Sequence, residues 1–149
     1  MPRTLVVCWL LMLNGFCSGA LYAADKTMGK LFIKAADSNV NGQQFADPEL
    51  ASTIKDMKVR HGKFAVVDDE SQAEFLIVVL ERKMEMRSPM GTPVNYKLVS
   101  ATFSIKDGSS WKPACKLTNS GFNGGSSWGI AAGRVINEAE KCAKEHAGR

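Results

Sequence analysis

The sequence has little histidine, few aromatic residues and no long apolar run beyond its N-terminal segment. Only two histidines occur among 149 residues, and aromatic residues make up 8%. Two solitary histidines do not form the ligand clusters that are typical of zinc sites. No later segment approaches the ~20 apolar residues that a transmembrane helix needs. The net charge is only +4, so the composition does not indicate a nucleic-acid partner.

The length and composition fit one globular domain. The chain has 45% hydrophobic and 23% charged residues, which excludes disordered, collagen-like and coiled-coil classes. A chain of this size has room for a single hydrophobic core. No internal repeat divides it further.

The N-terminus is typical of a secretory signal peptide. Arg3 is the only charge before Asp25, an apolar run covers 5–13, and small residues follow. This order predicts a signal peptide over 1–20, with cleavage between positions 20 and 24. The mature domain, 25–149, is then periplasmic in a bacterium or secreted, with no transmembrane segment after cleavage. The alternative is an uncleaved membrane anchor, which the short apolar run disfavours.

The remaining cysteines indicate a disulfide. Cys8 and Cys17 belong to the predicted signal peptide, which leaves Cys115 and Cys142. Two cysteines in an oxidising compartment predict a Cys115–Cys142 bridge, worth ~3–4 kcal/mol by loop closure. A redox or metal-binding pair is the alternative, although the chain lacks a C-x-x-C spacing.

Hydrophobic periodicity predicts an α/β (α+β) two-layer sandwich, with a mixed sheet of about five strands and two helices on one face. Residues 37–46 are polar and predict a loop. The expected elements in chain order are a strand over 30–34, a helix from Asp47-Pro48 to Gly62, strands over 63–67 and 75–86, a loop over 87–93, a strand over 96–106, a turn at Asp107-Gly108, an edge strand over 111–118 that contains Pro113, and a helix over 127–147.

The last helix supports the disulfide. Its apolar stripe consists of Trp128, Ala132, Val135, Ala139 and Cys142. This spacing places Cys142 on the side of the helix that faces the sheet. A strand cysteine such as Cys115 is therefore within its reach.

The middle of the chain resembles a group of bacterial envelope domains. An amphipathic helix leads to GKFAVVD at 62–68, and after an acidic spacer Ala73-Glu74 opens an apolar strand. This pattern resembles the TolB amino-terminal domain, the CsgG family of curli secretion and the lipoprotein activators of penicillin-binding proteins, over about the last two-thirds of the chain. The resemblance implies a non-catalytic periplasmic accessory domain. The lipoprotein cysteine is missing, and Glu74 replaces the usual Asp.

A glycine- and serine-rich segment before the last helix carries two candidate motifs. Residues 125–129 match G-x-S-x-G, the nucleophile elbow of hydrolases. His146 would lie ~28 Å from Ser127 along one helix, so no triad forms and no catalytic residue is expected. Residues Gly124, Gly125, Ser126 and Ser127 form a candidate anion-binding loop at a helix N-terminus. The alternative is a loop whose serine caps the helix.

Three methionines form a candidate Cu(I) site. Met84, Met86 and Met90 surround a predicted strand end, and thioethers are ligands for Cu(I). The simpler interpretation is that Met84 and Met86 share a strand face and pack against a helix. No cofactor is otherwise expected.

Two short charged segments are better explained as solvated surface. Hard cations need six or more oxygen ligands at defined spacing, which the acidic turn 68–70 does not supply. Lys55, Lys58, Arg60 and Lys63 form a small basic patch, whose alternative role is contact with an anionic lipid or glycan.

Two functions remain as predictions. The first is an exported accessory protein that binds another envelope protein or self-associates, through the edge strand 111–118 or the 87–95 loop. The second is a periplasmic protein that binds a small ligand or Cu(I).

Overall fold

The structure, a computed structural model, describes residues 27–40, 43–45, 47–88, 91–121 and 128–147. The predicted signal peptide, the candidate anion loop 124–127 and Met90 lie outside these ranges. In chain order the elements are β1 (Lys30–Ala35), β2 (Ser38–Val40), β3 (Gln43–Phe45), α1 (Pro48–Val59), β4 (Ala65–Val66), the 3-10 helix η1 (Glu70–Gln72), β5 (Phe75–Arg87), β6 (Val94–Asp107), β7 (Ser110–Gly121) and α2 (Trp128–Ala147).

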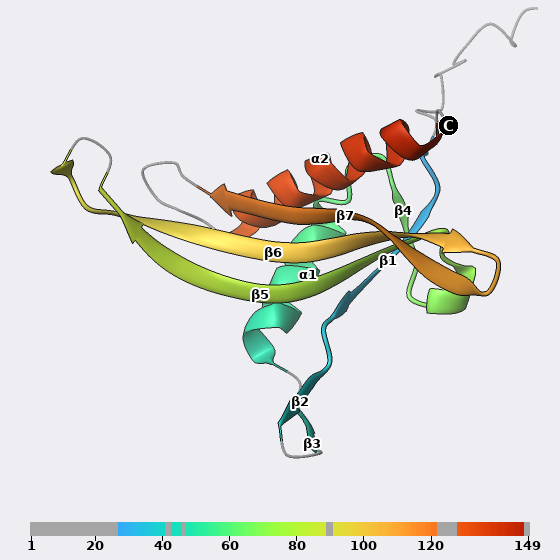
Figure 1. Ribbon diagram of the computed structural model, residues 1–149, viewed down its shortest axis with the longest axis horizontal. Coiled ribbons are helices and arrows are strands. Elements are labelled where there is room, and N and C mark those ends of the chain that lie inside the picture. The colour runs from blue at the N-terminus through green and yellow to red at the C-terminus, as the bar shows by residue number, and fades with distance from the viewer. Residues whose placement is uncertain (1–26, 41–42, 46, 89–90, 122–127, 148–149) are drawn as a thin grey trace, which may run out of the picture.

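The main sheet has five strands in the order β4-β1-β5-β6-β7. Strand β1 pairs in parallel with β4 and β5, whereas β5, β6 and β7 form an antiparallel meander. Both helices pack on one face of this sheet (Figure 1). The fold is therefore the mixed-sheet, two-layer α+β sandwich that the periodicity predicts. In the described part of the chain, no helix is long and apolar enough to cross a membrane.

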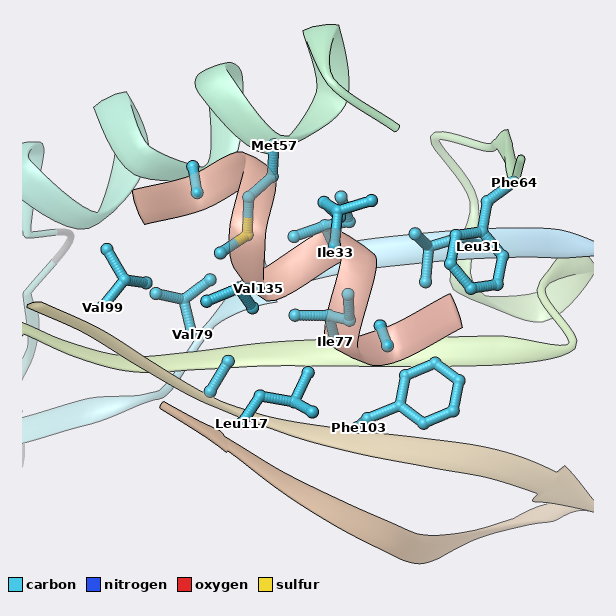
Figure 2. Close-up of a cluster of buried hydrophobic side chains, with 14 of the residues drawn as sticks. Leu31, Ile33, Met57, Phe64, Ile77, Val79, Val99, Phe103, Leu117 and Val135 are labelled. Atoms are coloured by element: carbon cyan, nitrogen blue, oxygen red, sulfur yellow. The ribbon is translucent and has the colours of Figure 1, made fainter. Parts of the chain in front are cut away.

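The core lies between the helices and the sheet (Figure 2). Met57 of α1 and Val135 of α2 are fully buried against strand residues such as Ile77 and Phe103. Phe64, Phe75 and Phe103 pack their rings together, with centroids 5.5 to 6.3 Å apart. One continuous core therefore joins both helices to the sheet.

Helix α1 begins where the sequence predicts. The Asp47 carboxylate accepts a hydrogen bond from the Glu49 amide at 2.8 Å, and Pro48 occupies the first turn, a position that needs no amide donor. A glycine that ends a helix usually follows the C-cap directly, and this position is expected for Gly62. Arg60 is the C-cap, so Gly62 lies one residue further along the chain than expected. Gly62 still has φ +60°, the left-handed conformation that favours glycine.

The disulfide prediction is confirmed. Cys115 of β7 and Cys142 of α2 are bonded, with their Cα atoms 6.5 Å apart. Strand β7 is an edge strand, and Pro113 adjoins a register break, because Phe103 pairs with Cys115 but Ser104 pairs with Pro113. This agrees with the rule that proline is confined to edges and bulges.

Two local predictions are wrong. The strand expected over 63–67 is reduced to Ala65–Val66. The expected loop 37–46 contains a small antiparallel pair, β2 and β3, which forms its own sheet. Residues 37–46 lack the alternating apolar pattern that predicts a strand, so periodicity did not indicate this pair.

Candidate functional site

The most distinctive feature of the surface is the end of the main sheet at which β5 and β6 project beyond β1. Strand β1 pairs with β5 only as far as Val79, and β7 pairs with β6 only as far as Lys97. Beyond Val79, β5 continues to pair with β6, 81–87 with 94–100, and the last part of this pairing, 85–87 with 94–96, extends beyond β7 as well. We call residues 81–87 and 94–100 the β5–β6 ribbon. Figure 1 shows the ribbon extending past both helices.

A bulge at Leu80 marks the base of the ribbon. The pairing shifts between Val79 and Glu81, and Leu80 is 46% exposed. The unbroken apolar run 75–80 favours a central strand covered on both faces, and the exposure of Leu80 departs from that expectation. A bulge turns successive side chains to the opposite face, so Arg82, not Glu81, faces the helix side opposite buried Val99.

Arg82 closes the end of the core. Its guanidinium lies 4.1 Å from the centre of the Trp128 ring, and its Nη1 donates to the Glu49 carbonyl oxygen at 3.3 Å. Lys97 lies over the same ring at 5.5 Å. Such cation–π contacts are typically worth about 0.5–2 kcal/mol each. The polar cluster therefore separates the core from the solvent-exposed part of the ribbon.

Beyond Arg82, the same face of the ribbon carries Met84 and Met86. These side chains are 66% and 72% exposed, so the expectation that they pack against a helix is wrong. The helices end before this part of the sheet, and nothing described covers it. Two exposed thioethers two residues apart share one face, but the third proposed copper ligand, Met90, lies outside the described residues.

The opposite face of the ribbon carries a row of alternating charges, Glu81, Lys83, Glu85 and Arg87, which we call the charge row. Lys83 Nζ lies 3.6 Å from a Glu81 oxygen and 3.2 Å from a Glu85 oxygen. Arg87 donates to Glu85 at 2.9 Å. The hydrogen bond from Arg87, followed by that from Lys83, holds the pKa of Glu85 below its ordinary value. The hydrogen bond to Glu85 and the charge of Glu81 raise the pKa of Lys83, so Lys83 and Glu85 both stay charged at neutral pH.

The edge of β7, predicted as an interaction surface over 111–118, has features that oppose strand addition. Lys112, Pro113 and Lys116 are exposed along it, and the register breaks beside Pro113. Lysine, proline and bulges on edge strands discourage pairing with another chain. The exposed methionines of the ribbon make it the better candidate for contact.

The disulfide has a histidine beside it that the sequence reasoning did not connect to it. His146 Nδ1 lies 2.9 Å from the Cys142 carbonyl oxygen and 3.8 Å from its Sγ. The three ligand atoms of Cys115, Cys142 and His146 lie within 4.8 Å of one another. A reduced pair would offer two thiols and an imidazole to a soft metal, whereas the bonded pair offers no thiolate. The i, i+4 spacing on one helix was the available signal.

The other charged candidates are engaged in separate contacts. In the acidic turn, Asp68 pairs with Lys58 at 2.6 Å, and Glu70 binds Lys34 at 2.9 Å. Asp69 caps η1, and the hydrogen bond from the Ser71 backbone amide is the largest factor that lowers the pKa of Asp69. These three carboxylates have three different roles and do not converge on one point.

The basic patch is likewise spread over the surface. Lys58 is held by Asp68, and the Arg60 side chain lies along α2 near Gly129 and Gly133. The Lys63 amide donates to Glu140. The candidate patch is therefore a set of separate contacts around the end of α1.

Comparison with known proteins gives a structural similarity alone. No family model matches the chain, and no curated protein matches it. Among solved structures, a hypothetical protein from Chlamydia trachomatis is similar with a TM-score of 0.46 and 12% identity. The match covers 81% of this chain and 99% of that chain. At this level the similarity carries no functional implication.

Proposed function

We propose that the protein is a non-catalytic binding protein of the cell envelope that acts through its β5–β6 ribbon, toward another envelope protein or a second copy. The observation that carries this proposal is the exposure of Met84 and Met86 at 66% and 72% on a part of the sheet that neither helix covers. Large apolar side chains gathered on a projecting element are typical of interaction sites. Methionine adapts well to varied partner surfaces.

An envelope location fits the chemistry of the chain. The Cys115–Cys142 bond is of the kind that persists in oxidising compartments and is rare in the reducing cytosol. The N-terminal pattern predicts export. The resemblance to envelope accessory domains favours the same location. The segment that carries this resemblance, GKFAVVD, contains the short strand β4 and leads through η1 to the central strand β5.

The test is a comparison of native masses without reductant, on protein recovered from the cell envelope. The ribbon variant Met84→Ser/Met86→Ser should lose an assembly that the wild-type chain retains, because the apolar contact is removed. Val59→Ser is the matched control, since Val59 is 75% exposed on α1, away from the ribbon. Circular dichroism and thermal melts should show that all three proteins fold alike.

Two results would contradict the proposal. The first is a wild-type protein that is monomeric, without any bound protein, under all conditions, because no ribbon-dependent assembly then exists. An assembly that survives in the ribbon variant but is lost in Val59→Ser would place the contact on α1 instead.

A copper-binding function is the second candidate, and the shared exposed face of Met84 and Met86 is the observation in its favour. Thioethers prefer Cu(I). Competition of the protein with a Cu(I) chelator should show tighter binding by wild type than by Met84→Ser/Met86→Ser. Equal competition by the two proteins would exclude this function.

A further inference from the structure

The ribbon leaves one edge of β5 without a strand partner. The Ala36 amide donates to the Val79 carbonyl oxygen at 2.8 Å, and this is where β1 leaves β5. From Leu80 to Arg87, none of the described strands pairs with β5 on this side. The backbone N–H and C=O groups along such an edge form a template for another strand.

The charge row on this segment is complementary to itself. Its signs read minus, plus, minus, plus from Glu81 to Arg87. An antiparallel second copy, centred so that Met84 lies opposite Met84, would place Glu81 opposite Arg87 and Lys83 opposite Glu85. The two-fold axis repeats both pairs, as in any isologous interface. Each charge would therefore face an opposite charge, an arrangement that stabilises cross-strand pairs.

The same row disfavours the neighbouring registers. A shift of two residues in one direction places Glu81 opposite Glu85 and Lys83 opposite Lys83. A shift in the other direction places Lys83 opposite Arg87 and Glu85 opposite Glu85. Like charges directly opposite are destabilising. The charge row therefore specifies one antiparallel register.

The other face of the ribbon gains from the same pairing. In this register Met84 lies beside its own copy, and Met86 lies opposite Arg82, whose methylene stem can cover the thioether. The pairing would bury the two side chains that the single chain leaves exposed. The ion pairs within the charge row are exposed contacts of small individual value, so exchanging them for pairs between copies costs little.

We propose that two copies of this chain associate by antiparallel pairing of their β5 edges about a two-fold axis at Met84, which forms one continuous sheet. The proposal rests on the proposed function, because it names a second copy as the partner of the ribbon. The juxtaposition that carries it is an unpartnered strand edge with a self-complementary charge row on one face and two exposed methionines on the other.

The test uses two charge variants of the full disulfide-bonded chain. Lys83→Glu/Arg87→Glu makes the row entirely acidic, and Glu81→Lys/Glu85→Lys makes it entirely basic. Each alone should self-associate at least roughly a hundredfold more weakly than wild type, because four attractive pairs become four repulsive ones. An equimolar mixture should restore association as a 1:1 heterodimer. Sedimentation velocity and native mass spectrometry measure both results.

The control for the acidic variant is Lys55→Glu/Lys112→Glu, which lowers the net charge by the same amount as Lys83→Glu/Arg87→Glu. Its two positions are exposed and lie on α1 and β7. It should associate like wild type. Self-association of either charge variant at wild-type strength would overturn the proposal, and so would a mixture that stays monomeric.

A monomeric wild type would also overturn the proposal, but it would not by itself decide the proposed function. If monomeric wild type still forms a complex with an envelope protein that Met84→Ser/Met86→Ser cannot form, the ribbon has a different partner. If wild type forms neither a homodimer nor a ribbon-dependent complex with an envelope protein, the ribbon is not an interaction site, and both proposals fail.

Discussion

Breaking the disulfide should be the most destabilising change that leaves the core side chains in place. The bond joins Cys115 on the edge strand β7 to Cys142 on the helix α2. It closes a loop with a sequence separation of 27 residues. In the chain-entropy model a loop of that length corresponds to about 3.5 kcal/mol of stability at 25 °C. This is a large share of the stability of a small domain, which is typically about 5–15 kcal/mol.

The assay is thermal and urea unfolding of Cys115→Ala/Cys142→Ala beside the wild type. For a domain of this size, the loss should lower the Tm by roughly 14 °C. The urea m-value should rise, because the unfolded chain without the cross-link exposes more surface. Cys142 is only 3% exposed, so the alanine variant also removes a little buried volume, and its loss should be slightly above the loop-closure value.

Wild type treated with a dithiol is the control, since it removes the cross-link and keeps every side-chain atom. Reduced wild type and the double variant should agree to within about 1 kcal/mol. A Tm decrease below about 4 °C in both proteins would refute the loop-closure reasoning. It would mean that the segments of β7 and α2 stay in contact in the unfolded ensemble, or that the bond does not restrict the conformations of the unfolded chain.

Three further predictions test local features of the fold. Gly62→Ala should cost about 1–3 kcal/mol in urea unfolding, because φ is +60° and an added Cβ would meet the Glu140 carboxylate; wild-type stability would contradict this conformation. Met57→Ala should cost about 2–5 kcal/mol, because Met57 is 0% exposed, and an unchanged Tm would place it outside the core. Asp69→Asn should be less stable than wild type above pH 3.8, the ordinary pKa. Because the Ser71 amide lowers the pKa of Asp69 in the folded state, this difference should disappear as the pH falls through the lowered pKa. A stability difference between Asp69→Asn and wild type that does not change with pH would contradict this prediction.

Local patterns in the sequence were enough to predict much of the fold. The Asp47-Pro48 start of α1 depends on capping within one turn, and the long strands β5, β6 and β7 depend on apolar runs and alternation. The disulfide was predicted from the two cysteines that remain after the predicted signal peptide, and the apolar stripe of α2, which places Cys142 on the core side, supported it. Each of these patterns extends over only a few neighbouring residues, so it can be recognised in the sequence without the tertiary structure.

The candidate site depended on contacts that no local pattern contains. Met84 and Met86 have the same sequence pattern whether a helix covers them or not. Their exposure follows because both helices end before this part of the sheet, and the bulge at Leu80 decides which side chains face the helices. His146 lies beside Cys142 because of the i, i+4 spacing on α2, but its proximity to Cys115 depends on how α2 packs on β7.

The free edge of the ribbon was likewise decided by tertiary structure. The alternating charges of 81–87 are visible in the sequence, but alternation alone does not tell which strand edge is paired. That depends on where β1 stops, at Ala35 opposite Val79. Sequence by itself determined the elements and the cross-link, because propensity, capping and periodicity are local. Tertiary structure decided which surfaces remain uncovered, because coverage depends on the relative lengths and positions of elements far apart in the chain.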